Sequence, residues 1–117
     1  MTVIALAGGG TAGHTSPMIA TAQALFKADP SAEVFCVGTP KGLETRVIPA
    51  AGLDLAYIDP VPLPRRLSPA LLATPVRLAR AVGQARGLLR RRAADAVIGF
   101  GGYASLPVCL AARACRL

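Results

Sequence analysis

A glycine-rich segment near the start of the chain, Gly8–His14, lies between an apolar run and a helical pattern. The apolar run, Val3–Ala7, is typical of a buried strand, and Pro17–Ala28 has the spacing of a helix. A glycine turn between a strand and a helix leaves backbone N–H groups at the helix N-terminus, where the helix dipole also favours an anion. This order predicts an α/β unit with a phosphate-facing turn.

The rest of the chain repeats the alternation of strand and helix, which predicts an open parallel sheet with helices on both faces. The expected strands are Thr2–Ala7, Glu33–Gly38, Asp54–Ile58 and Ala96–Phe100, and the expected helices are Pro17–Ala28, Leu43–Ala51, Leu71–Arg92 and Leu106–Arg116. Right-handed crossovers place every strand-to-helix turn at one edge of such a sheet. We therefore expect the first glycine turn and a second one, Gly99–Tyr103, to lie along the same edge.

Prolines suggest where two helices begin or end. Pro49 predicts a kink or an early end in the second helix, because proline lacks the N–H that a helix uses. Pro75 suits a first helical turn, so the long third helix is expected to begin near Thr74, its N-cap. Leu71 and Leu72 would then belong to a separate short turn.

The whole chain has a net charge of +7, and its positive charge is concentrated in one segment. Eight arginines fall between Arg65 and Arg92, and no acid lies between Asp59 and Asp95. Leucines mixed with these arginines suit an anionic bilayer surface, whereas a nucleic-acid surface would more often add aromatic residues. A solvated helix face is the alternative. The residues expected to contact a membrane are Arg65, Arg66, Leu71, Leu72, Arg77 and Arg80.

The cysteines and the single histidine limit the possible metal chemistry. Cys36, Cys109 and Cys115 lie in apolar segments without CxxC spacing, which predicts buried thiols in a reducing compartment. One histidine and scattered thiols are too few ligands for a metal site, so we expect no metal and no cofactor.

His14 is the candidate catalytic residue, because an imidazole that titrates near pH 7 can accept a proton from a sugar hydroxyl. A structural histidine at a helix start is the alternative. In the second glycine turn, Tyr103 and Ser105 add hydroxyl groups, although Ser105 could instead be an ordinary N-cap. The residues expected to bind substrate are Gly10, Thr11, Ala12, Gly13, Gly102, Tyr103 and Ser105.

Gly8, Gly10 and Gly13 also fit the G-x-G-x-x-G pattern of dinucleotide-binding proteins. That fingerprint includes an acid at the end of the second strand, where it holds a ribose. The corresponding segment, Gly38–Lys41, contains no acid. An NAD(P)-binding domain therefore stays an alternative, although the acid that would hold the ribose is missing.

Taken in order, these motifs resemble the MurG family of peptidoglycan N-acetylglucosaminyltransferases. The resemblance covers nearly the whole chain and is carried by Gly9–His14 with Pro17, Val37–Thr39, Gly42–Glu44, Val47–Pro49 and Ile98–Tyr103. It implies the GT-B fold of two Rossmann-like domains. Residues 1–117 would be part of the membrane-facing, acceptor-side amino-terminal domain, with the carboxyl-terminal donor domain absent.

The resemblance implies transfer of GlcNAc from UDP-GlcNAc to the MurNAc 4-hydroxyl of lipid I, which is undecaprenyl-diphosphate-linked MurNAc-pentapeptide. The transfer inverts the anomeric centre, gives lipid II for peptidoglycan synthesis, and serves cell-wall growth, cell shape and division. It takes place at the cytoplasmic face of the bacterial membrane, on a peripheral enzyme without a bound metal.

The resemblance also assigns residues. His14 matches the histidine proposed to assist deprotonation of the acceptor, and Thr11–Gly13 matches a loop that contacts substrate. Tyr103 and Ser105 match the second glycine loop, linked to acceptor or diphosphate binding. Leu63–Arg80 matches the membrane-facing patch more loosely. Ala12 departs from the pattern, because many members have glycine there.

We expect a chain of this length to be inactive by itself and active once a donor domain is restored. A free-standing, acceptor-binding and membrane-recruiting subunit of a split GT-B transferase is the alternative.

Overall fold

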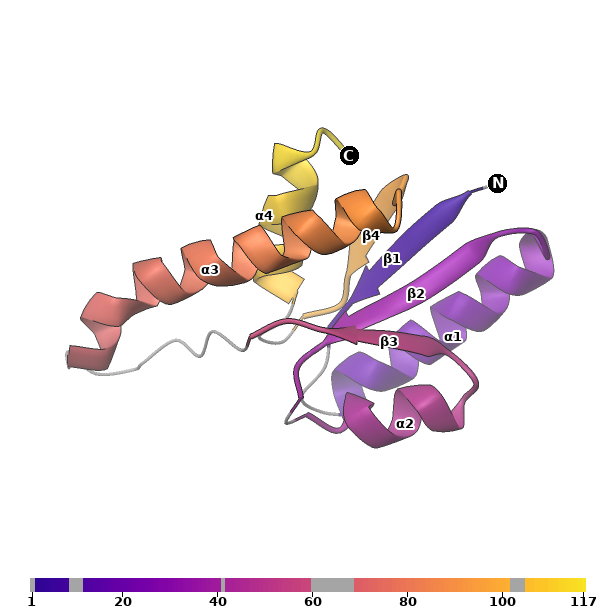
Figure 1. Cartoon of the computed structure of the whole chain (residues 1–117). Coiled ribbons are helices and arrows are strands. Elements are labelled where there is room, and N and C mark those ends of the chain that lie inside the picture. The colour runs from indigo at the N-terminus through magenta and orange to yellow at the C-terminus, as the bar shows by residue number, and fades with distance from the viewer. Residues whose placement is uncertain (1, 9–11, 41, 60–68, 102–104) are drawn as a thin grey trace.

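The computed structural model describes residues 2–8, 12–40, 42–59, 69–101 and 105–117 (Figure 1). Strands and helices alternate along these ranges, as predicted. The elements are β1 (Val3–Ala7), α1 (Ala12–Ala28), β2 (Glu33–Gly38), α2 (Glu44–Ala50), β3 (Asp54–Tyr57), α3 (Pro69–Arg91), β4 (Ala96–Gly99) and α4 (Ser105–Ala114).

The strands of the described residues form one parallel sheet in the order β3-β2-β1-β4. Ala7 is paired with Val37 on one side and with Gly99 on the other. The N–H of Gly8 extends the pairing by donating to the carbonyl oxygen of Val37 at 3.2 Å. The turns that follow β1, β2 and β4 therefore start side by side at the carboxyl edge of the sheet.

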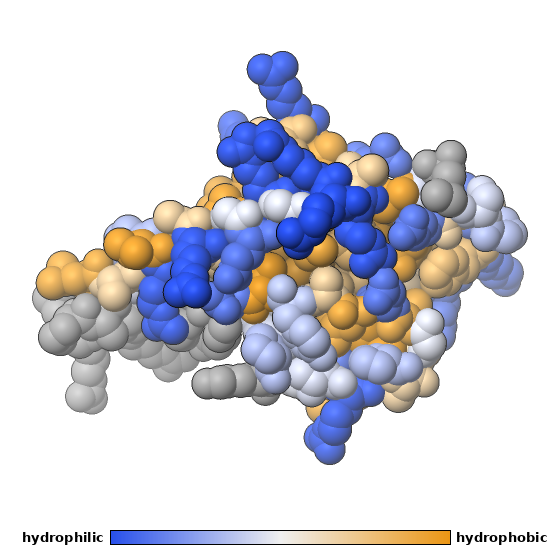
Figure 2. Space-filling model, viewed as in Figure 1, coloured by the Kyte–Doolittle hydropathy of each residue, from blue (hydrophilic) through white to orange (hydrophobic). Residues whose placement is uncertain are grey.

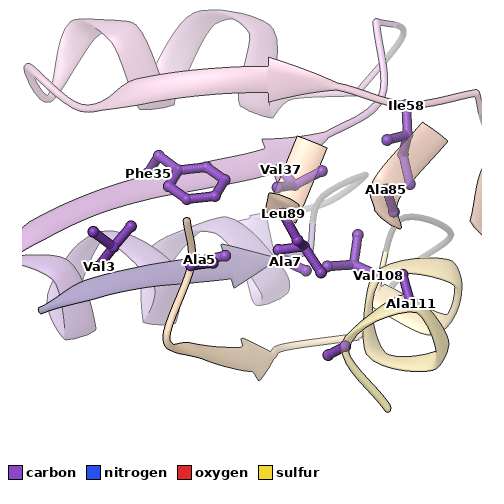
Figure 3. Close-up of a cluster of buried hydrophobic side chains, with 12 residues drawn as sticks. Val3, Ala5, Ala7, Phe35, Val37, Ile58, Ala85, Leu89, Val108 and Ala111 are labelled. Atoms are coloured by element: carbon purple, nitrogen blue, oxygen red, sulfur yellow. The ribbon is translucent and has the colours of Figure 1, made fainter. Parts of the chain in front are cut away.

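Different helices cover the two faces of the sheet, which confirms the predicted layers (Figure 1). On one face, alternate residues of β1 and β2 pack against α3 and α4 (Figure 3), in a core that includes Val3, Ala5, Ala7, Phe35, Val37, Ala85, Leu89, Val108 and Ala111. The opposite face packs against α1 and α2 through Leu6, Cys36, Met18, Ala22 and Ile48. The period of two along the strands sends successive side chains into separate cores.

Two helices begin earlier than predicted. Helix α1 starts at Ala12 and contains Pro17, so His14 lies in its first turn. Helix α3 contains Pro75, and the expected separate turn before it was wrong because the helix is continuous from Pro69. A proline removes only one hydrogen bond, at a cost of about 3 kcal/mol, and the turns on either side keep theirs. Pro49 lies near the end of the short helix α2, as expected.

The amino edge of the sheet is closed by charged side chains. Arg92 Nη2 lies 2.6 Å from Oδ2 of Asp54 and 3.3 Å from Oε1 of Glu33. Its guanidinium stacks over Phe35 at 4.3 Å from the ring centroid. The hydrogen bond to Asp54 raises the pKa of Arg92. This residue therefore ties the end of α3 to both β2 and β3.

The expectation of three buried thiols is confirmed for only one of them. Cys36 is buried in β2, and burial raises the pKa of its thiol to about 11. Cys109 is exposed and Cys115 is half-buried, and all three are free thiols. Cys109 lies on α4 with its Sγ close to Gly99 of the edge strand β4, and Cys115 follows the end of α4.

Candidate functional site

The connections of the sheet change direction at β1. Its neighbour β2 lies on one side and β4 on the other, with α1 and α3 on opposite faces. In open α/β sheets, ligands bind outside the carboxyl ends of the strands at such a switch point. The two glycine turns predicted from the sequence follow β1 and β4, so both begin there.

The two turns touch each other because Gly8 has no side chain. A Cβ at Gly8 would lie 3.2 Å from the carbonyl oxygen of Gly101 and 3.1 Å from Cβ of Phe100. The N–H of Phe100 donates to the carbonyl oxygen of Ala7 at 2.8 Å, which holds the second turn against the end of β1. The prediction that both turns share one edge is confirmed, and they are in direct contact.

The imidazole of His14 lies against the second turn. A Cβ at Gly101 would be 3.0 Å from Nε2 and 3.1 Å from Cδ2 of His14. The His14 side chain is half-buried. The ring therefore lies at the carboxyl edge between the two turns, where a neutral imidazole can accept a proton from a bound hydroxyl.

Two helix N-termini point to the same edge. Helix α1 begins at Ala12, with Gly13 exposed, and α4 begins at Ser105. The first turn of a helix presents backbone N–H groups that the helix itself does not use, and its dipole adds positive charge. The Oγ of Ser105 lies next to Gly99, 2.5 Å from where a Cβ would be. These features suit an anionic group such as a diphosphate.

The structure brings together only part of the predicted site. Gly13, His14 and Ser105 all lie in first turns of helices at the carboxyl edge. The predicted residues outside the described ranges are Gly10, Thr11, Gly102, Tyr103, Arg65 and Arg66. Of Ala12 and Leu71, the structure describes the helical backbone and not the side-chain environment.

Glu44 also lies at this edge, and the sequence patterns predicted no role for it. It is fully buried, and its Oε1 accepts the N–H of Thr39 at 3.0 Å and the hydroxyl of Thr39 at 3.2 Å. A Cβ at Gly38 would lie 2.5 Å from Cγ of Glu44, and one at Gly42 would overlap its carboxylate. The turn after β2 is thus folded around this carboxylate. An acid at a helix start, preceded by a turn with Gly38 and Gly42, was the available signal.

The arginine-rich helix α3 has an exposed apolar surface in its first half. Leu72 and Val76 are 83% and 72% exposed, and Arg77 and Arg80 are exposed beside them. This half of α3 extends beyond the sheet, and apolar and basic atoms lie next to each other on it (Figures 1 and 2). Across the described ranges, no helix combines the length and the apolar character needed to cross a membrane.

The second half of α3 is anchored to the sheet. Ala81, Ala85 and Leu89 are buried. Gln84 accepts the N–H of Asp59 at 2.9 Å and donates to its carboxylate at 3.0 Å. Anchoring at one end therefore fixes the direction in which the apolar and basic first half projects.

A doubly wound parallel sheet with helices on both faces and a histidine at its switch point defines a Rossmann-like domain. The chain belongs to glycosyltransferase family 28, whose N-terminal-domain model matches residues 4–117. This family assignment agrees with the resemblance found from the motifs.

Named relatives agree with the family assignment. A UDP-N-acetylglucosamine–N-acetylmuramyl-(pentapeptide) pyrophosphoryl-undecaprenol N-acetylglucosamine transferase of Cutibacterium acnes is 58% identical over 100% of this chain and 31% of its own length. The protein of the same name from Acidothermus cellulolyticus is 54% identical over 94% of this chain and 30% of its length. The crystal structure of Acinetobacter baumannii MurG matches 98% of this chain and 33% of that protein, with a TM-score of 0.80 and 28% identity. The chain thus spans about a third of the length of these relatives.

Proposed function

We propose that this chain is the acceptor-side part of an inverting transferase that moves GlcNAc from UDP-GlcNAc to the MurNAc 4-hydroxyl of lipid I. The observation that carries the proposal is the imidazole of His14 lying against Gly101 at the switch point of the sheet. The names of the relatives supply the substrates of the proposed reaction.

In the proposed reaction, the backbone N–H groups at the starts of α1 and α4 bind the diphosphate of lipid I. His14 takes the proton of the MurNAc 4-hydroxyl while the oxygen of that hydroxyl attacks the anomeric carbon of GlcNAc. The bond from that carbon to the UDP oxygen breaks, and UDP leaves with the electron pair. A single displacement of this kind inverts the anomeric centre, and the donor-side half of the enzyme holds UDP-GlcNAc.

We also propose that the first half of α3 rests on the cytoplasmic face of the membrane as a peripheral contact. Leu72 and Val76 are too exposed to contribute to the core and lie beside Arg77 and Arg80. Apolar side chains flanked by arginines bind anionic bilayers by combining insertion with charge attraction. This contact would bring the carboxyl edge close to a lipid-linked acceptor.

The catalytic proposal is tested by joining this chain to the remaining two thirds of the Cutibacterium acnes relative and measuring lipid II formation. We expect turnover with the unchanged chain and a fall in kcat of roughly 10² to 10⁴-fold for His14→Ala, with little change in thermal stability. An inactive fusion, or unchanged kcat in the variant, contradicts the proposal. Activity after mixing the two parts as separate chains would favour the split-transferase alternative.

The membrane proposal is tested by sedimentation with vesicles that contain phosphatidylglycerol. Leu72→Ser with Arg77→Gln should weaken binding about ten-fold or more at low salt, because one arginine near an anionic surface contributes about 1 kcal/mol and the loss of the inserted leucine side chain adds to this. Arg113→Gln is the control for the charge change, since it removes an exposed arginine that lies on α4 and not on the first half of α3. Equal binding by both variants contradicts the proposed contact.

A further inference from the structure

We propose that Gly101 is a positioning residue that sets where the imidazole of His14 lies. The two residues come from different turns and meet only because the chain folds both turns over β1 and β4. The catalytic consequence of this contact rests on the proposed function, whereas the contact itself does not.

The position of Gly101 cannot accept a side chain for two separate reasons. Its φ is +98°, a left-handed conformation that glycine adopts readily and other residues adopt at a cost. In addition, a Cβ would lie 3.0 Å from Nε2 and 3.1 Å from Cδ2 of His14, well inside the 3.5–4.0 Å of a comfortable contact. Even a methyl group would therefore require the ring to move by a few tenths of an ångström.

Gly101 is itself held in place by its neighbours. Its carbonyl oxygen lies against Gly8, and the preceding Phe100 is hydrogen-bonded to Ala7 and packs with the core under α1. His14 is fixed from the other side by the first turn of α1. The ring therefore lies between two anchored backbones, and a displacement of either turn would move it.

Proton transfer requires a base within hydrogen-bond distance of its hydroxyl, about 2.6–3.2 Å between heavy atoms. A ring displaced by part of an ångström loses this geometry, although the turns still bind the diphosphate. A change at Gly101 is therefore expected to lower kcat more than it raises KM.

Gly52 provides a matched control. It also has a positive φ, +78°, but nothing lies within 4 Å of the place where its Cβ would be. Gly52→Ala thus introduces similar backbone strain without touching His14. Any effect that Gly101→Ala has beyond Gly52→Ala reports on the contact with the imidazole.

The first test uses NMR on the chain itself, in which His14 is the only histidine and its ring signals are unambiguous. The unchanged chain should give a cross-peak between the His14 ring protons and the Hα protons of Gly101. Gly101→Ala should shift the ring signals, and Gly52→Ala should leave them in place. A missing cross-peak in the unchanged chain overturns the proposal whether or not Gly101→Ala folds. Equal ring signals in the unchanged chain and both folded variants also overturn it.

The second test measures kinetics in the fusion with the donor-side part. We expect Gly101→Ala to lower kcat about ten-fold or more with KM changed less than two-fold, and Gly52→Ala to change neither. Equal kcat for both variants overturns the positioning role. If the NMR contact is present but His14→Ala keeps its full kcat, then the proposed function fails while the contact between the turns stands.

Discussion

The carboxyl edge of the sheet is assembled from glycines, helix starts and one imidazole, whereas the amino edge is closed by charged side chains. At the carboxyl edge, Gly8 and Gly101 let two turns touch and leave room around His14. At the amino edge, Arg92 binds Asp54 and Glu33 and stacks on a ring of the core. One edge is assembled from backbone turns and helix starts, and the other uses its side chains to join strands. Substitutions at the two edges should therefore affect different properties.

The largest predicted difference concerns the reactivity of two thiols. Cys109 is exposed on α4 near the carboxyl edge, whereas Cys36 of β2 is buried in the core between the sheet and helices α1 and α2. We expect a thiol reagent at pH 7 to modify Cys36 at least roughly 10³-fold more slowly, because its reaction needs the structure to open. Raising the pH to 9 should not remove the difference, since the pKa of Cys36 is about 11. Mass spectrometry of modified peptides measures both rates, and similar rates would show that the core is open.

The next largest effect is expected at Glu44, a fully buried charged side chain at the carboxyl edge. Glu44→Ala removes the acceptor for the N–H and hydroxyl of Thr39 and leaves a cavity. We expect a loss of about 3 kcal/mol or more in the free energy of unfolding. Glu44→Gln keeps the volume and an acceptor oxygen, so urea denaturation should show a clearly smaller loss. Equal losses in both variants would mean that the carboxylate oxygen is unimportant.

A smaller effect is expected for Arg92 at the amino edge. Arg92→Ala removes two partly exposed ion pairs and one cation–π contact, which together contribute about 1–2 kcal/mol. The His14 ring signals should stay in place, because the change lies at the opposite edge. Arg80→Ala is the control: it breaks one exposed pair with Asp59 and should leave the urea midpoint unchanged. A shift of the His14 signals in Arg92→Ala would break the separation between the edges.

The sequence was sufficient to predict the sheet and the edge that carries the site. Strand β2 was predicted with its observed bounds, Glu33–Gly38, because a continuous apolar run ends in a turn. Proline positions were less reliable guides: Pro17 and Pro75 lie inside helices, since a helix tolerates the loss of one hydrogen bond.

Contacts between distant segments could not be predicted from the sequence. Parallel topology predicts that the turns of His14 and Gly101 share an edge, but their contact depends on how closely Gly8 lets the second turn approach. The burial of Glu44 likewise depends on the fold of the turn after β2 rather than on its own sequence neighbours. Both features are set by the tertiary structure.

In the proposed site, the two glycine turns together bind one anion beside His14. An NMR titration of the chain with inorganic pyrophosphate tests whether they do. We expect saturable shifts at Gly13, His14, Gly101 and Ser105, with the signals of Arg92 at the amino edge unchanged. Shifts centred on the amino edge, or the absence of saturable shifts at the two turns, would contradict the account.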